Sequence, residues 1–296
     1  MTDPQVSREE RERQHFNRLV GQAAGTSLEM ARDNILRYAS PPRDSPHDLE
    51  FVFHLLGNLR GATVVELGCG DGLNTVILAS LGASVIGVDV SEESLALTAA
   101  RARANAVARQ VRVVHAGAPQ LPLKDGTADK VLCVAILHHV DIQATALEIH
   151  RILKPSGVAV FLEPMEGPLW LRLFKRMIPQ SEGVSPDERP LTRGEVLAVN
   201  KAIGRGGRRR EFGLIYRFIG RLGLRSRLQG ISLRVDAWLL ARVRITRLLA
   251  SPVVWEALKG EPNGQDLRPE SPPPMRATAA AAGTRLDGVK TNPGSA

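Results

Sequence analysis

Apolar and polar positions follow two different periods through the middle of the chain. Short apolar runs rich in Val and Ile predict five buried strands, which lie near residues 62–67, 84–88, 111–115, 130–134 and 157–163. The segments between them have helical spacing and predict helices near residues 72–81, 91–108 and 141–152. Strands that alternate with helices predict an α/β fold, in which helices cover both faces of a parallel sheet.

The segments on either side predict further helices. Residues 7–38 carry apolar residues at helical spacing, and residues 47–59 predict an amphipathic helix that ends at Gly61. Thr192, with Glu195 three residues later, is typical of a capping box, so a helix is expected to begin there and continue through residue 203.

Two other segments lack such a pattern. Residues 164–186 mix aromatic and basic side chains and predict a mobile helix or lid. Residues 260–296 are rich in Pro, Ala, Gly and Ser without an apolar period, which predicts a disordered tail.

A glycine-rich segment, Glu66-Leu-Gly-Cys-Gly-Asp-Gly72, directly follows the first predicted strand. A buried strand that breaks into alternating glycines predicts a sharp turn into a helix, and the missing Cβ atoms let a ligand lie against the backbone. Asp89 ends the second predicted strand, 23 residues after Glu66. A carboxylate at that point is placed to accept hydrogen bonds from both ribose hydroxyls of an adenosine.

These motifs resemble those of the class I S-adenosylmethionine-dependent methyltransferases, in the methyltransferase type 11-like group. The resemblance continues through Val131-Leu-Cys-Val-Ala-Ile-Leu-His-His-Val140 and Glu148-Ile-His-Arg-Ile-Leu-Lys-Pro-Ser-Gly157, and it is dense over residues 60–165. A nicotinamide-dependent dehydrogenase is the usual alternative for a glycine-rich turn. It usually shows Gly-x-Gly-x-x-Gly, whereas this chain has glycines at positions 68, 70 and 72.

The resemblance implies a Rossmann-like, doubly wound, mostly parallel seven-stranded sheet whose last strand is antiparallel. The two additional strands would come from residues 207–213 and 252–258. The methyltransferase domain would then span residues 61–259 with a basic helical insertion at about 214–251, and residues 1–60 would form a helical segment that covers the site.

S-adenosylmethionine is the cofactor that the resemblance implies. Asp89 would bind its ribose, Val90 would flank its adenine, and Glu66 would help to fix its methionine end. The backbone positions expected to contact the cofactor are Gly68, Cys69, Gly70, Gly72, Gly117, Ala118 and Ala135.

One of these positions departs from the family. The family's third strand usually ends in Gly-Asp-Ala, and its acid meets the adenine amino group, but this chain reads Ala116-Gly117-Ala118. Either the backbone or a water serves the adenine, since that contact needs only an acceptor, or cofactor binding is weakened and catalysis is lost.

The candidate catalytic residues lie after the fourth and fifth predicted strands. His138 and His139 follow the fourth strand and Glu163 closes the fifth, where related enzymes bring the methyl group and acceptor together. One histidine would act as a general base or hydrogen-bond donor. Alternatively, both histidines organise the turn. Methyl transfer requires no metal, and the sequence offers no metal-ligand spacing.

The charge of the chain is unevenly distributed. The net charge is +8, but residues 201–250 hold 13 basic residues against two acidic ones, a net charge of +11 that leaves −3 for the remainder. The first part of the insertion predicts a helix with an apolar face (Phe212, Ile215, Ile219, Leu222) opposite Arg217, Arg221 and Arg225. This region either docks on an anionic membrane or an acidic substrate, or is a solvated helical pair.

The best-supported function is therefore methyl transfer to a small-molecule or lipid-type acceptor. The alternatives are an RNA or protein methyltransferase and a non-catalytic cofactor-binding protein. Nucleic acid is disfavoured because no recognised binding motif is present and only 4% of residues are aromatic. The polar N-terminus, the two core cysteines and the lack of an 18-residue apolar run predict a cytoplasmic protein without a transmembrane segment, in peripheral contact with membrane at most.

Overall fold

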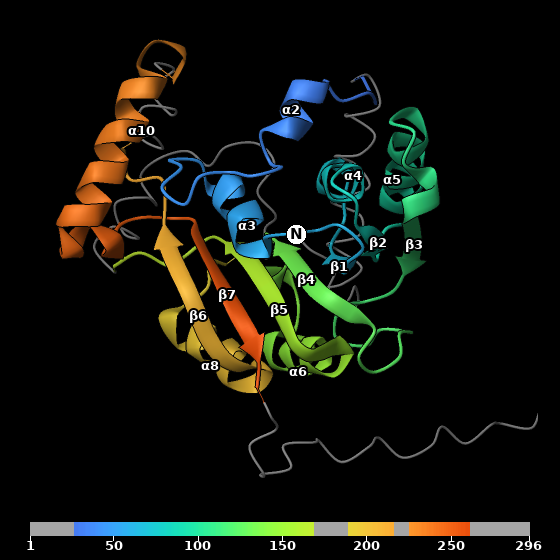
Figure 1. Cartoon of the computed structure of the whole chain (residues 1–296). Helices are drawn as coiled ribbons and strands as arrows, with labels where there is room; N and C mark the ends of the chain where they lie inside the picture. The colour runs from blue at the N-terminus through green and yellow to red at the C-terminus, as the bar shows by residue number, and fades with distance from the viewer. Residues whose placement is uncertain (1–26, 169–188, 216–224, 261–296) are drawn as a thin grey trace, which may run out of the picture. The chain divides into compact units, whose positions relative to one another are not determined.

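A seven-stranded sheet forms the centre of the fold in a computed structural model of the chain, which describes residues 27–168, 189–215 and 225–260 (Figure 1). The strands are β1 (Thr63–Leu67), β2 (Ser84–Asp89), β3 (Val111–His115), β4 (Ala128–Val134), β5 (Leu153–Glu163), β6 (Gly204–Glu211) and β7 (Val253–Lys259). Their order is β3-β2-β1-β4-β5-β7-β6. Strands β1 to β5 pair in parallel, and β7 runs antiparallel to both β5 and β6. The predicted fold class is confirmed, including the antiparallel last strand.

Helices cover both faces of this sheet (Figure 1). Helices α3 (Asp48–Leu56), α4 (Leu73–Ser80) and α5 (Glu92–Ala104) lie on one face, and α6 (Ile142–Ile152) and α8 (Arg193–Ile203) lie on the other. The described segments also contain α2 (Arg32–Leu36), α10 (Arg225–Arg242) and the 3₁₀ turns η1 (Ala108–Gln110), η2 (Leu137–His139) and η3 (Arg244–Leu248). Successive strand residues point to opposite faces, so neighbours enter different cores. Val65, Val131 and Phe161 pack with α6 and α8, whereas Val64, Leu132 and Val160 pack with α3 and α4.

The capping box at the start of α8 is confirmed. The Thr192 hydroxyl accepts from the Glu195 N–H at 3.2 Å, and a Glu195 carboxylate oxygen accepts from the Thr192 N–H at 2.8 Å. These bonds satisfy two N–H groups that the first turn of a helix otherwise leaves without partners.

In the N-terminal part of the chain, two helices are shorter than predicted. Residues 27–31 are not helical, because Asn105 binds this segment instead, accepting from the Met30 N–H and donating to the Leu28 carbonyl, both at 2.8 Å. Helix α3 ends before Gly57 rather than at Gly61, since Gly57 adopts φ 64° and turns the chain out of the helix. Residues 7–26 lie outside the described part of the chain.

The insertion differs from its predicted pattern as well. Phe212, expected on the apolar face of a helix, instead follows the end of β6 and is buried, with its ring centroid 5.8 Å from that of Phe51. The rest of that predicted face falls largely in residues 216–224, outside the described residues, as do most of the predicted lid and the tail. No helix in the described segments is long and apolar enough to cross a bilayer.

Candidate functional site

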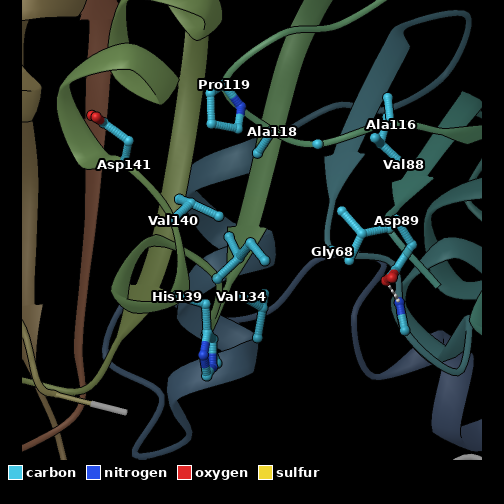
Figure 2. A pocket seen from close by; sticks show the side chains of 15 residues that line it. Gly68, Val88, Asp89, Ala116, Ala118, Pro119, Val134, His139, Val140 and Asp141 are labelled. Carbon is cyan, nitrogen blue, oxygen red and sulfur yellow. Dashed lines mark hydrogen bonds between the residues drawn. The ribbon is translucent and has the colours of Figure 1, made fainter. Parts of the chain in front are cut away.

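A pocket of about 630 Å³ lies at the carboxyl ends of β1, β2 and β4 (Figure 2). Its lining comes from the glycine-rich turn, the ends of β2 and β3, and the segment that follows β4. The lining residues are Gly68, Gly70, Val88, Asp89, Val90, Ala116, Gly117, Ala118, Pro119, Val134, Ala135, Ile136, His139, Val140 and Asp141. The carboxyl ends of parallel strands at a switch in strand order are the usual ligand site of such sheets, and here the order reverses between β1 and β4.

Two glycines of the turn serve different purposes. Gly70 has φ 52°, and a Cβ built on it would meet no atom within 4 Å, so the backbone borders open space in the pocket. Gly72 does not line the pocket. It has φ 80° as the N-cap of α4, and a Cβ there would lie 2.7 Å from the Thr98 Cα, so this glycine permits the close packing of α4 and α5.

The Asp89 carboxylate is fixed at the end of β2 by the backbone. One oxygen accepts from the Gly70 N–H and the other from the Ser91 N–H, both at 2.9 Å (Figure 2). A carboxylate has about four acceptor positions, so each oxygen retains capacity for a ligand hydroxyl. Burial raises the pKa of Asp89, while the hydrogen bonds from the backbone of Ser91 and Gly70 oppose that shift.

Glu66 lies beneath the turn, buried, and does not line the pocket. One of its oxygens accepts a hydrogen bond from the Thr75 hydroxyl. Burial raises the pKa of Glu66 to about 8, against the lowering effect of the hydrogen bonds from Thr75 and Asn74.

The wall of the pocket opposite the glycine turn is the segment after β3. His115 at the end of β3 donates from Nε2 to the Val90 carbonyl at 2.9 Å, and Gln120 donates its N–H to the Gly117 carbonyl at 3.1 Å. No side chain at position 117 reaches into the pocket, because the residue is glycine. Backbone groups of Ala116–Pro119 are therefore the polar groups that this segment offers to a ligand.

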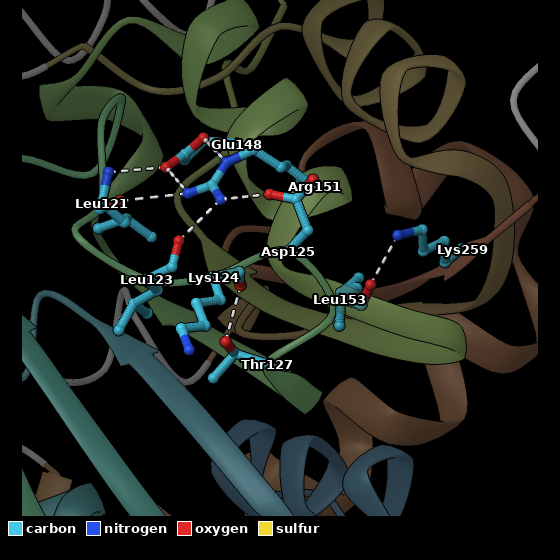
Figure 3. Close-up of polar contacts among 9 residues, drawn as sticks. All are labelled: Leu121, Leu123, Lys124, Asp125, Thr127, Glu148, Arg151, Leu153 and Lys259. Carbon is cyan, nitrogen blue, oxygen red and sulfur yellow. Dashed lines mark hydrogen bonds and ion pairs between the residues drawn. The ribbon is translucent and has the colours of Figure 1, made fainter.

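A group of charged residues on α6 holds the continuation of that segment in place (Figure 3). The Arg151 guanidinium donates to the carbonyls of Leu121 and Leu123, at 3.1 and 2.7 Å, and to carboxylates of Glu148 and Asp125. Glu148 in turn accepts from the Leu121 N–H at 2.7 Å. The hydrogen bonds to Glu148 raise the pKa of Arg151, so the guanidinium stays charged. It holds the loop that leads from the pocket wall to β4 through the carbonyls of Leu121 and Leu123 and through the Asp125 side chain.

The segment after β4 separates the two candidate histidines. Ala135 has φ 54°, a strained conformation for a residue with a Cβ, and the chain there leaves β4 and enters η2. His138 then points into the core, where its Nδ1 lies 2.7 Å from Glu163 Oε2. His139 is half-buried and lines the pocket, with its ring centroid 4.0 Å from that of His138 (Figure 2).

Glu163 organises this segment from within the core. It is fully buried, and its Oε1 accepts from the N–H groups of Ile136 and Leu137, both at 2.8 Å, while Oε2 holds His138. A carboxylate can only accept, so His138 donates through Nδ1. Glu163 and His138 thus position the turn that carries His139, and neither lines the pocket.

Comparison with known proteins adds the family. The family model described as "Methyltransferase domain" matches residues 65–161. A ubiquinone biosynthesis O-methyltransferase from Alkalilimnicola ehrlichii is 33% identical over 121 residues, which cover 40% of this chain and 47% of the relative, and a protein of the same name from Bordetella avium is 32% identical over 40% of this chain and 48% of the relative. Residues 65–161 therefore correspond to a methyltransferase domain of the class I S-adenosylmethionine-dependent type.

The solved structures agree with the observed fold of this methyltransferase family member. The crystal structure of geranyl diphosphate C-methyltransferase from Streptomyces coelicolor A3(2) has a TM-score of 0.55 at 16% identity, covering 87% of this chain and all of that one. An identity this low supports the fold alone. The match to the curated relatives spans about half of their length.

The pocket fits the adenosine end of the family's cofactor, S-adenosylmethionine. Asp89 offers two partly used carboxylate oxygens, and Gly70 leaves open space beside the backbone. Among the residues predicted to bind the cofactor, Gly68, Gly70, Asp89, Val90, Gly117, Ala118 and Ala135 meet at the pocket, whereas Glu66, Cys69 and Gly72 lie behind its wall. Burial raises the pKa of Cys69 and of Cys133, so both thiols remain protonated at neutral pH.

Several lining residues were absent from the sequence prediction. They are Val88, Ala116, Pro119, Val134, Ile136, Val140 and Asp141. Asp141 had a local signal, because it precedes an amphipathic segment, and its carboxylate caps α6 by accepting from the Ala144 N–H at 2.9 Å. The apolar residues had no such signal, since strand residues look alike in sequence whether or not they border a ligand.

Proposed function

We propose that this protein transfers a methyl group from S-adenosylmethionine to a small-molecule acceptor, with a lipid-type molecule as the acceptor class. The observation that supports this best is the pocket itself, which has Asp89 fixed on its β2 side and His139 on its β4 side (Figure 2). The first group suits the ribose of the cofactor, and the second lies where an acceptor would approach.

Each group of residues has a separate role in this proposal. When bound, S-adenosylmethionine would supply a methyl group carried on a sulfonium sulfur, and that sulfur would be left as a neutral thioether once the methyl group is on the acceptor. Asp89, Gly68 and Gly70 bind and orient the adenosine end, while Glu66 supports the turn from below through its hydrogen bond with the Thr75 hydroxyl. His139 accepts the proton of an acceptor hydroxyl or amine, or donates a hydrogen bond to it. His138 and Glu163 keep the histidine-bearing turn in place, so most of the rate enhancement comes from positioning.

The named relatives favour a small molecule over a macromolecule. The curated relatives reported above are named for O-methylation in ubiquinone biosynthesis, which supports an oxygen nucleophile of a small molecule. An RNA or protein acceptor has less support, because Ala135-Ile-Leu-His138 replaces the Asn/Asp-Pro-Pro-Tyr motif of many base-amino methyltransferases. Gly117 is the one residue that favours a non-catalytic protein. The backbone of Ala116–Pro119 is held by hydrogen bonds beside the pocket, which supports the interpretation in which main-chain groups bind the adenine in place of an acid. A cytoplasmic protein with peripheral membrane contact completes the proposal.

The test is made in two steps. Calorimetry of the full chain with S-adenosylmethionine and, separately, with a nicotinamide cofactor measures which one binds. The protein is then incubated with a cell extract and the isotopically labelled methyl donor, and mass spectrometry identifies the labelled product. His139→Ala is expected to bind the cofactor like the wild type but to lose about 100-fold or more of the labelling rate. Tight binding of the nicotinamide cofactor, or labelling of RNA or protein alone, would contradict the proposal.

A further inference from the structure

Helix α10 exposes large apolar side chains while it buries two polar residues beside the apolar Leu240. Its buried positions include Ser232 and Asp236, at 2% and 4% exposure, and Asp236 accepts from the N–H groups of Leu214 and Ile215 at 3.0 and 2.6 Å. Its exposed positions include Ile231 at 65% and Trp238 at 58%. A surface helix usually directs its apolar stripe to the core and its polar side to water.

The exposed apolar residues are concentrated in this one stretch. Nine large apolar side chains are exposed in the described part of the chain, and six of them lie between residues 231 and 248. We call these six the α10 patch: Ile231, Val235, Trp238, Val243, Ile245 and Leu248. The first three lie at i, i+4 and i+7, so they share one face of the helix. Single exposed apolar residues are common, but a contiguous group indicates a binding surface.

The charges around the α10 patch are of one sign. Arg234 and Arg242 are exposed on α10, and Arg247 is exposed after it. The only carboxylate between residues 231 and 248 is Asp236, which is turned inward. The patch therefore combines apolar side chains, including a tryptophan, with a basic rim, and the surface that matches both features is a bilayer with anionic headgroups.

We propose that the α10 patch docks on an anionic lipid surface. A second copy of this chain fits less well, because a two-fold contact through the patch would bring the exposed arginines of both copies, Arg234 and Arg242, close together. The surface expected from the sequence was a different one, the face of residues 212–222, but Phe212 at its start is packed into the core against Phe51. The proposed lipid-facing residues thus lie in the second part of the insertion, residues 231–248, and not in residues 212–222.

The topology connects this surface with the pocket. Strand β6 is antiparallel to β7, as is β5, so β6 runs parallel to β5 and ends at the sheet edge where the pocket opens. The insertion that contains α10 leaves from that end of β6 and returns to the start of β7 (Figure 1). Docking through α10 brings a lipid-type acceptor to the pocket side of the sheet, a consequence that rests on the proposed function, whereas the docking itself does not.

Vesicle flotation without any methyl donor tests the docking. Wild type is expected to float with phosphatidylcholine–phosphatidylglycerol vesicles at low salt, less at high salt, and little with phosphatidylcholine alone. The triple variant Ile231→Ser, Val235→Ser, Trp238→Ser is expected to lose about tenfold or more in partition coefficient, because binding scales with buried apolar area. Arg234→Gln with Arg242→Gln is expected to lose about fivefold for each charge.

The control is Leu197→Ser, which removes a single leucine that is 67% exposed on α8 and should float like the wild type. Calorimetry with S-adenosylmethionine and thermal melting show whether each variant is folded, so failed folding, failed docking and a failed cofactor assignment are distinguished. Trp238 emission, taken as the difference between wild type and Trp238→Phe, should shift to the blue on anionic vesicles.

Three results would overturn the proposal. The first is flotation of the triple variant equal to that of the wild type, and the second is equal wild-type binding to neutral and anionic vesicles. The third is that the wild type does not float and sediments as a dimer, whereas the triple variant sediments as a monomer. That result would show that a second copy covers the patch.

Discussion

The cofactor half of the sheet and its opposite edge use charge in different ways. At the ends of β2 and β5, two carboxylates are held by backbone N–H groups: Asp89 is half-buried in the pocket wall and Glu163 is fully buried. Around β6 and β7, charge is abundant but lies mostly at the surface as arginine. A short motif with few charges therefore indicates a site more reliably than a high density of charge, since a buried carboxylate is retained only where hydrogen-bond donors satisfy it.

Several arginines of β6 are engaged in contacts within the fold. Arg208 pairs with Glu256 at 2.8 Å and Arg209 with Glu211 at 3.1 Å. The Arg210 guanidinium lies over the rings of Phe51 and Phe212, 5.6 and 4.9 Å from their centroids. The net charge of +11 over residues 201–250 thus overstates the charge available to a partner, because several of these arginines stabilise the fold.

The largest expected effect comes from removing Glu163. Glu163→Ala leaves the N–H groups of Ile136 and Leu137 and the His138 ring without their buried acceptor, so unfolding free energy should fall by about 4 kcal/mol. The control Glu211→Ala breaks a partly exposed pair with Arg209, in which the side chains are 31% and 15% exposed, and should cost about 1 kcal/mol. Denaturation by urea measures both. Equal losses in the two variants would remove the distinction between the two regions.

The pH dependence of stability tests the buried carboxylate beneath the glycine turn. Glu66 keeps its proton up to a pKa of about 8 in the folded chain, whereas it releases the proton near its ordinary value of 4.5 when unfolded. The folded state binds more protons between these values, so this group's contribution to stability is full below about pH 4.5 and is lost as pH rises to about 8.

Glu66→Gln should remove this dependence, because an amide resembles the protonated acid. Without cofactor, the variant should match the wild type near pH 4.5 and exceed it above pH 8, by on the order of 3 kcal/mol. Urea denaturation across that range measures the difference. A constant offset between the two proteins at every pH would show that Glu66 is ionised throughout.

Cofactor affinity gives the next effect in size. Asp89→Ala removes a carboxylate placed to accept charge-assisted hydrogen bonds from the ribose and should weaken S-adenosylmethionine binding by about 2 kcal/mol, roughly 30-fold in Kd. Glu92→Gln, a change at an exposed carboxylate near His115, serves as the control and should bind normally. Calorimetry that finds unchanged binding in Asp89→Ala would place the ribose elsewhere.

The cofactor half could be predicted because its signals are local. The glycine turn, the acid that ends β2 and the capping box of α8 each lie within a few residues, and their geometry follows from backbone requirements. The seven-stranded sheet and the antiparallel β7 came from the family resemblance rather than from any local signal.

Contacts between distant segments could not be predicted in this way. His138 and His139 are neighbours of the same type, and only the η2 turn and Glu163, 25 residues from His138, decide which one enters the core. Phe212 is buried because Phe51, far away in the sequence, packs against it. Helical spacing shows which residues share a face, but the contacts of Asp236 show which face turns inward.

The smallest effect is expected at the basic edge. Arg208→Gln leaves the buried Glu256 carboxylate with fewer hydrogen bonds, and because the guanidinium is half exposed, the loss should be about 1 kcal/mol and smaller at high salt. Arg205→Gln changes an exposed arginine of the same strand and should leave stability unchanged. Neither change should alter cofactor affinity, since both lie on β6 and outside the pocket lining. Urea denaturation at two salt concentrations measures the stability of both variants, and calorimetry measures their affinity for S-adenosylmethionine. If Arg205→Gln destabilised the chain as much as Arg208→Gln, the positive charge of β6 would act as a whole, and the division between paired and unpaired arginines would be wrong.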